Sequence, residues 1–363
     1  MSDMREEMLR TLDRIVEETL TPKAREAGET EIGASGAGAA PGGALGGPLW
    51  SALDGAGLLA VAGAGGDTDV SFADAMALVR RSAYHAIPVP LGEAIVGRWL
   101  ARRAGLEAPD GAIGLSLASP ESPIGLSGLA SRQDGVSVTV ARSGDGPVLI
   151  AGIGAGRQGQ LALLDIGATS VTLSRNIAGE QRETFTVAPP HAGQKLLAVA
   201  DHAGAGADLF LAGALLRVVQ MAGALDRTLE HCMLWANDRV QFGRQIGKFQ
   251  AIQHQLAVLA SEAAAATAAV DQAIEASGDA PDFLAIAVAK ARVGEAAGKG
   301  ANIAHAVFGA MGFTREHALH FSTRRLWAWR NEFGGEAHWQ GELGRLFAAK
   351  GGNRLWETLT ARG

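Results

Sequence analysis

The sequence has almost no cysteine and no surplus of positive charge, and each absence excludes a class of protein. Cys232 is the single cysteine among 363 residues, so neither an intramolecular disulfide nor a cysteine-based metal site is possible. It lies in an apolar helical run, and we expect it to be a buried small hydrophobe. The 9 histidines show no cluster with the spacing of metal ligands, so we expect no metal. The 32 basic and 38 acidic residues are mixed along the chain, and no basic stripe indicates a nucleic-acid partner.

Long apolar stretches are absent as well. The first residues, MSDMREEMLRTLDRIVEE, are charged and lack the apolar core of a signal peptide. No run of about 18 apolar residues occurs, which is the length that a transmembrane helix needs. We therefore expect a cytoplasmic protein with no membrane span.

Hydrophobic periodicity divides the chain into three parts. Helical spacing occurs in the first and last parts, at 4–20, 49–61, 72–86 and 93–105, and near 207–241, 248–276, 282–310, 316–332 and 336–361. Between them, short runs such as GVSVTVARS and SVTLSR alternate Val and Thr with polar residues, which is typical of antiparallel strands. A Gly- and Ala-rich segment, 28–48, indicates a flexible loop. Asp282 is the expected N-cap of a helix.

These patterns predict an α+β multidomain protein. We expect an N-terminal helical domain, a small middle antiparallel β domain or barrel, and a C-terminal four-helix bundle, with boundaries at 1–110, 111–200 and 201–363.

One junction in the last part is unusually polar. Residues 238–254 read DRVQFGRQIGKFQAIQH and place Arg, Gln, Lys and His side chains around two glycines, between two predicted helices. Each residue alone would suit a solvated loop with helix-capping residues, but the joint spacing would not. The stretch resembles the signature R-x-Q-F-G-x-x-I-G-x-F-Q of the acyl-CoA dehydrogenase family. The α–β–α order and the segment FGAMGFTREHALHFSTRR (308–325) are also similar to this family, so the resemblance covers most of the chain.

The resemblance implies a cofactor, a reaction and partners. Family members bind FAD and remove two hydrogens from the α and β carbons of an acyl-CoA substrate. They produce a trans-2-enoyl-CoA and pass the electrons to an electron-transfer flavoprotein. The junction of one subunit reaches the FAD held mainly by another, which implies a homo-oligomer or a heterotetramer with a second acyl-CoA dehydrogenase chain. The residues that the resemblance assigns to FAD are Arg239, Gln241, Phe242, Phe249, Gln250, His305 and Gly309. A guanidinium such as that of Arg239 can bind phosphate with two hydrogen bonds.

The sequence departs from the family pattern at the catalytic base. The thioester α proton is weakly acidic, so the family places a carboxylate against the α carbon. The commonest position falls nine residues after Arg324, on Phe333, and Glu332 stands one residue earlier. One residue on a helix is about 100° of rotation, although a helix end followed by glycine can compensate. Glu332 is therefore a candidate base, and equally a candidate surface carboxylate. The other position used in the family falls on Gly213 and Ala214, which closes that option.

The middle domain departs from the pattern too. The family's TEP-x-x-GSD loop is replaced by SLASPESPIGLSGLAS (116–131), where Ser116, Ser119 and Ser122 are either hydrogen-bond donors or ordinary loop residues. Three functions stay open. The chain is a complete FAD-dependent acyl-CoA dehydrogenase with Glu332 as its base, a non-catalytic partner subunit of a two-chain enzyme for bulky or steroid-derived CoA thioesters, or an acyl-CoA-binding protein. The retained junction counts against the third.

Overall fold

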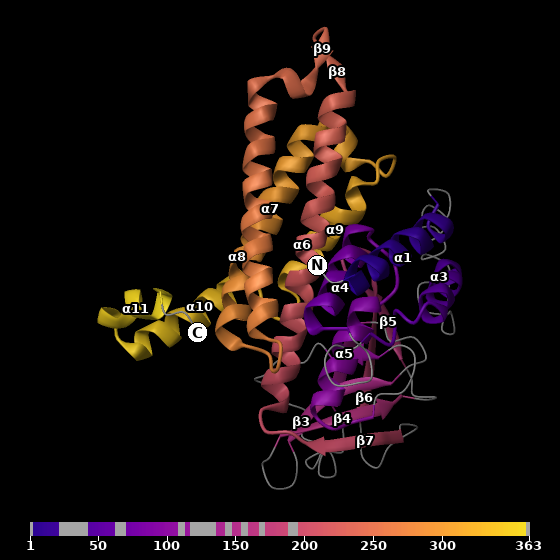
Figure 1. The fold of residues 1–363 in the computed structure, drawn as a ribbon, viewed down its shortest axis with the longest axis vertical. Coiled ribbons are helices and arrows are strands. Elements are labelled where there is room, and N and C mark those ends of the chain that lie inside the picture. The colour runs from indigo at the N-terminus through magenta and orange to yellow at the C-terminus, as the bar shows by residue number, and fades with distance from the viewer. Residues whose placement is uncertain are drawn as a thin grey trace.

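A computed structural model shows a long helical bundle with a small β domain at one end (Figure 1). It describes residues 3–21, 43–61, 70–107, 113–116, 136–141, 147–153, 159–166, 171–187 and 195–360. The described elements follow the order helices, strands, helices. The predicted α+β class, with a small β region and a C-terminal helical bundle, is confirmed.

The helices described before the first strand are α1 (Asp3–Thr19), α3 (Gly43–Gly55), α4 (Phe72–Tyr84) and α5 (Leu91–Arg103). A capping box starts α4, because the Ser71 side chain accepts the backbone N–H of Asp74 and the Asp74 carboxylate accepts that of Ser71. The predicted helix over 49–61 is wrong at both ends. Its helix, α3, begins inside the segment expected to be a loop, because the fully buried Leu49 and Leu53 fix it against the core.

Two small sheets form the middle part in the described residues. The first has the order β1-β3-β4-β7 and the second β2-β6-β5. The strands are β1 (Gly114–Leu115), β2 (Val136–Ala141), β3 (Val148–Ile153), β4 (Gly159–Asp165), β5 (Thr172–Arg175), β6 (Gln181–Val187) and β7 (Lys195–Asp201). All pairs are antiparallel, as predicted, except β1 with β3. Ser116 is fully buried and bridges to Val140, whereas Ser119 and Ser122 lie outside the described residues.

The C-terminal part is built from long helices that run beside one another (Figure 1). They are α6 (Ala205–Asp238), α7 (Gln250–Ala276), α8 (Phe283–Phe308) and α9 (Leu319–Asn331), followed by α10 (Glu336–Lys350) and α11 (Leu355–Thr360). The carboxylate of Asp282 accepts the Ala285 backbone N–H at 2.7 Å, which confirms it as the N-cap of α8. The predicted helix over 336–361 is interrupted, because Gly351 has a left-handed φ of 88° and η4 (Gly352–Arg354) follows it.

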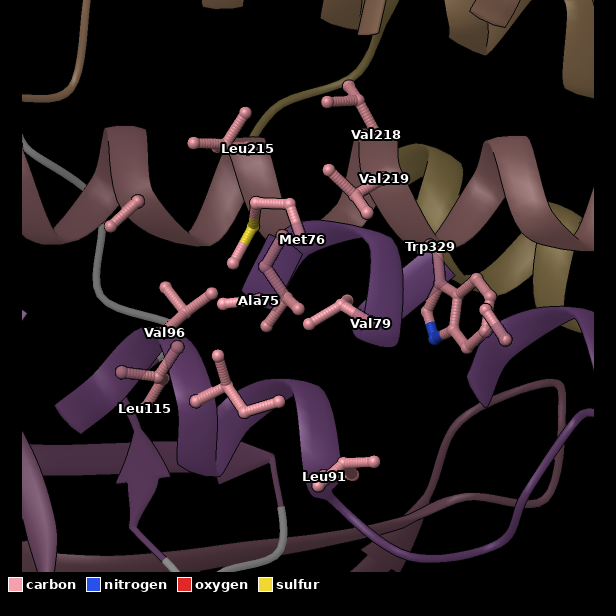
Figure 2. Close-up of a cluster of buried hydrophobic side chains, with 14 of the residues drawn as sticks. Ala75, Met76, Val79, Leu91, Val96, Leu115, Leu215, Val218, Val219 and Trp329 are labelled. Atoms are coloured by element: carbon pink, nitrogen blue, oxygen red, sulfur yellow. The ribbon is translucent and has the colours of Figure 1, made fainter. Parts of the chain in front are cut away.

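A single apolar core joins the three parts around α6. Figure 2 shows Leu215 and Val219 of α6 facing Met76 of α4, with Val96 of α5 and Leu115 of β1 nearby. By length and composition α6 could cross a membrane, but 94% of its most apolar window is buried inside the protein. Such burial is typical of a core helix.

Candidate functional site

The polar junction folds as a tight hairpin at the end of α6. β8 (Val240–Gln241) pairs antiparallel with β9 (Arg244–Gln245). Phe242 and Gly243 connect them with φ of 52° and 78°, the two left-handed residues of a type I′ turn. The short helix η2 (Ile246–Lys248) then leads to the start of α7. The motif therefore reverses the chain between two helices of the bundle in a defined turn.

The predicted FAD residues of this hairpin point away from the chain's own core. Arg239, Gln241 and Gln250 are exposed, and Phe242 is 92% exposed. Phe249 is half-buried, with its ring 6.2 Å from the Phe242 ring. An exposed aromatic ring on a left-handed residue is unfavourable for a chain in isolation.

His305 and Gly309 lie at the same end of the bundle. Gly309 ends α8 with a φ of 61°. The His305 ring stacks on Phe313 at 4.6 Å between centroids, and burial lowers the pKa of His305. Trp235 of α6 stacks on Phe308 of α8 at 4.8 Å, which brings the two helix ends together. The structure thus gathers all the residues assigned to FAD around one end of the bundle (Figure 1).

Glu332 directly follows α9, at the end of the helix opposite to its first residue, Leu319. That helix has 13 residues, so about 20 Å separates its ends at about 1.5 Å per residue. The Glu332 side chain is only 13% exposed, and its carboxylate accepts hydrogen bonds on both oxygens. Arg217 Nε donates to Oε2 at 2.6 Å, Arg182 Nε donates to Oε1 at 3.1 Å, and Arg182 Nη2 also donates to Oε1. Asn176 Nδ2 lies 3.4 Å from Oε1. Burial alone would raise the pKa of Glu332, but the charges of Arg217 and Arg182 outweigh it and lower the pKa.

The same ion cluster extends to other elements. Arg217 donates from Nη1 to Glu93 of α5 at 2.7 Å. Glu180 pairs with Arg182 at 3.1 Å and accepts Trp329 Nε1 at 3.0 Å. Burial opposes ionisation of Glu180, but neighbouring arginines, Arg182 first, lower its pKa to about 2. α5, α6, α9 and β6 therefore meet at a buried set of fixed charges.

An aromatic ring fills the two positions where a base was expected. Phe333 is buried, and a Cβ added to Gly213 would lie 2.2 Å from its Cε1 atom. The Phe333 ring also lies 6.1 Å from that of Phe210, and its carbonyl accepts Trp339 Nε1 at 3.0 Å. Because Gly213 has no side chain, the ring of Phe333 can rest directly on the backbone of α6. Phe333 holds a left-handed φ of 54°, which packing on every side maintains.

Comparison with known proteins finds similarity to acyl-CoA dehydrogenases in the C-terminal helices. The model of the acyl-CoA dehydrogenase C-terminal domain matches residues 207–331, which run from α6 to the end of α9. This part of the chain is similar to the C-terminal domain of acyl-CoA dehydrogenases. The acyl-CoA dehydrogenase IpdE2 of Mycobacterium tuberculosis is 36% identical over 112 residues, which cover 31% of this chain and 34% of that protein. IpdE2 of Mycolicibacterium smegmatis is 34% identical over 112 residues, which cover 31% of this chain and 35% of that protein. These matches span about a third of the length of the curated relatives.

Solved structures of acyl-CoA dehydrogenases are similar to this chain in fold over nearly its whole length. The ChsE4–ChsE5 complex from Mycobacterium tuberculosis matches with a TM-score of 0.78 at 19% identity, over 96% of this chain and 98% of that chain. The Tcur3481–Tcur3483 steroid ACAD matches with a TM-score of 0.74 at 20% identity, over 96% and 98%. A glutaryl-coenzyme A dehydrogenase with glutaryl-CoA matches with a TM-score of 0.71 at 18% identity, over 94% of each chain.

The geometry weighs against Glu332 as a catalytic base. A base needs an oxygen that can reach the substrate proton and a pKa near the working pH. Both oxygens of Glu332 are instead engaged by buried arginines, and its pKa is lowered. Phe333, not Glu332, faces the second base position on Gly213. Glu332 as a base stays a prediction, and the surroundings are those of a buried ion pair.

The ion cluster around Glu332 is not among the predicted site residues. It consists of the partners Arg182 and Arg217 and of two further carboxylates that pair with them, Glu180 and Glu93. Arg217 nevertheless stands alone in the apolar run FLAGALLRVVQMAGAL. A lone arginine in an apolar helical run indicates a buried ion pair. Among the described residues, no group of three His, Cys, Asp or Glu side chains could hold a metal ion.

Proposed function

We propose that this chain is the non-catalytic partner subunit of a two-chain, FAD-dependent acyl-CoA dehydrogenase. The observation that carries the proposal is the packing of Phe333 on Gly213, because an apolar contact fills both positions where family members place the carboxylate. The carboxylate next to it, Glu332, is bound by Arg217 and Arg182. A second chain with a free carboxylate would then take the α proton.

The hairpin end supports a role in holding the cofactor of that second chain. FAD has two phosphates and extended rings, which suit the exposed guanidinium of Arg239, the amides of Gln241 and Gln250 and the ring of Phe242. These groups face outward, so they would meet a flavin bound mainly by the partner. When bound, FAD supplies hydride acceptance from the β carbon. The electrons would then pass to an electron-transfer flavoprotein.

The substrate class and assembly rest on the similar proteins. Two of the similar structures are named for two different chains, and one of these is described as a steroid ACAD. We infer a heterotetramer in the cytoplasm that oxidises a bulky or steroid-derived CoA thioester to its 2-enoyl-CoA.

A second candidate is a homo-oligomeric dehydrogenase in which Glu332 is the base. One observation favours it: Glu332 directly precedes Phe333 at a helix end, where Gly334 has a left-handed φ of 87° and allows the backbone to turn. In this case the carboxylate would have to leave Arg217 and Arg182 during each turnover.

The visible absorption spectrum and the mass in solution separate the two candidates. Our proposal expects a colourless protein when the chain is purified alone, and a yellow complex of both chains when it is coexpressed with a second, more complete dehydrogenase chain. An acyl-CoA should bleach only the complex. A yellow homo-oligomer that an acyl-CoA bleaches would refute the proposal. The variant Glu332→Gln should keep its turnover in the complex, and complete loss of turnover with flavin retained would make Glu332 the base.

A further inference from the structure

We propose that Glu332 is an interdomain latch, which holds the hairpin of β5 and β6 onto the helical bundle. This inference goes beyond the proposed function and does not depend on it, because it concerns the contact between two parts of the chain itself. The carboxylate lies between one arginine from the bundle, Arg217, and one from the middle part, Arg182. It is therefore the charge that both sides share.

The hairpin reaches the bundle through its turn and the start of β6. Arg324 of α9 donates from Nε to the carbonyl of Ile177 in the turn at 2.9 Å. Trp329 of α9 donates from Nε1 to Glu180 at 3.0 Å. The Asn176 side chain accepts the backbone N–H groups of Ala178 and Glu180 at 3.0 Å each, so the turn has a fixed shape. The hairpin thus meets α9 as a preformed unit.

The bundle side of the latch is fixed independently of the hairpin. Lys290 of α8 is buried and donates to the carbonyls of Trp329 and Arg330 at 3.2 and 3.0 Å, at the end of α9. Trp339 of α10 binds the carbonyl of Phe333 at 3.0 Å. The residues on both sides of Glu332 are therefore held by α8 and α10, so the part free to move if the latch fails is the hairpin.

The hairpin is held in its own sheet by the pairing of β6 with β2 and by the buried side chains of Phe185 and Val187. All four residues of β5 are exposed, and β5 is the edge strand of its sheet in the described residues. In contrast, the side chains of Arg182 and Arg217 are 8% and 1% exposed. Removing the shared carboxylate leaves two cations without their main partner in a site that excludes water, which strongly favours opening. Opening would restore water to Arg182 and separate β6 from α9.

Hydrogen–deuterium exchange of the full chain tests the latch. In Glu332→Gln, amides of β6 (Gln181–Val187) should exchange at least tenfold faster than in the wild type, which corresponds to about 1.4 kcal/mol at 25 °C. Exchange in α7 (Gln250–Ala276) should stay unchanged. The same effect is expected for Arg182→Gln. The double variant should exchange no faster than the faster single variant, because both changes remove the same contact.

The matched control is Glu342→Gln, which makes the same chemical change in an exposed i,i+3 pair with Arg345 on α10. It should leave exchange in β6 within twofold of the wild type. If Glu332→Gln does not fold, Arg182→Lys replaces it, because lysine keeps the charge and loses the paired donors. Unchanged β6 exchange in the variant measured would overturn the latch. Equal acceleration of β6 and α7 would overturn it too, because that result indicates a general loss of stability.

Discussion

The contact of Phe333 with Gly213 predicts a specific failure of additivity. Phe333→Ala removes a buried ring, and Gly213→Ala adds a methyl group where that ring already lies, with Cβ 2.2 Å from Phe333 Cε1. Each single substitution should lower the free energy of unfolding. In the double variant the added methyl group meets the space left by the ring, so the second change should no longer create a clash.

The magnitudes follow from general values for such changes. Truncating a buried Phe to Ala costs about 3–5 kcal/mol. The left-handed φ of residue 333 does not alter this comparison, since Phe and Ala are both L residues with a Cβ. Overpacking at residue 213 costs about 1–3 kcal/mol, and about 1 kcal/mol returns because Ala is the better helix former. The double variant should therefore be about 2 kcal/mol more stable than the sum of the single effects predicts.

Urea unfolding of the four proteins, followed by far-ultraviolet circular dichroism, measures this coupling. Strict additivity within about 0.5 kcal/mol would show that the ring of Phe333 does not rest on Gly213. It would also remove the observation on which the non-catalytic role depends. A double variant that binds an acyl-CoA, unlike the wild type, would show in addition that the ring blocks a site for substrate.

Three further predictions follow from other contacts. Burial lowers the pKa of Lys290 to about 7 from 10.5. Between these two pH values the unfolded chain binds more protons than the folded chain, so the free energy of unfolding should rise with pH across that window. In Lys290→Met, chemical denaturation at several pH values should show a smaller rise. Gly223→Ala should lower the free energy of unfolding by about 2–3 kcal/mol, because the added Cβ would lie 2.1 Å from the backbone oxygen of Arg80. A melting temperature equal to that of the wild type would contradict the close approach of α4 and α6. Arg239→Gln should leave the free energy of unfolding within about 0.5 kcal/mol of the wild-type value, because the residue is exposed. It should reduce the flavin absorbance per complex. Full flavin retention would remove Arg239 from the cofactor site.

The sequence predicts the long helices well, because their apolar spacing is regular. The segment near 207–241 became α6 (Ala205–Asp238), and the segment 282–310 became α8 (Phe283–Phe308) with the expected N-cap. The start of α3 was not predictable, because its first turns consist largely of glycine and alanine and depend on packing by residues further along. The break at Gly351 was missed for a different reason: glycine is tolerated within helices, so its left-handed φ is visible only in the structure.

The candidate site also has one part that the sequence predicts and one part that it does not. The residues assigned to FAD come from local motifs, and the structure brings them to one end of the bundle because each motif sits at a helix end. The ion cluster was not predictable, because Glu93, Arg182, Arg217 and Glu332 come from four separate elements. Their partners lie more than a hundred residues apart along the chain, with separations of 115 to 150 residues. Long-range pairing of this kind has no local pattern that a single sequence could reveal.

The exposed apolar surface at the hairpin end of the bundle affects the stability and abundance of the protein in the cell. Besides Phe242, four apolar side chains at or near that end are at least half exposed: Met233, Leu234, Val240 and Phe313. Such a surface favours aggregation and attracts chaperones and proteases as long as nothing covers it. If the proposed second chain covers this surface, molecules made in excess over that chain would be degraded or would precipitate. The steady-state abundance of the protein would then follow the supply of the second chain. In this sense the hairpin end limits how much of the protein can persist on its own.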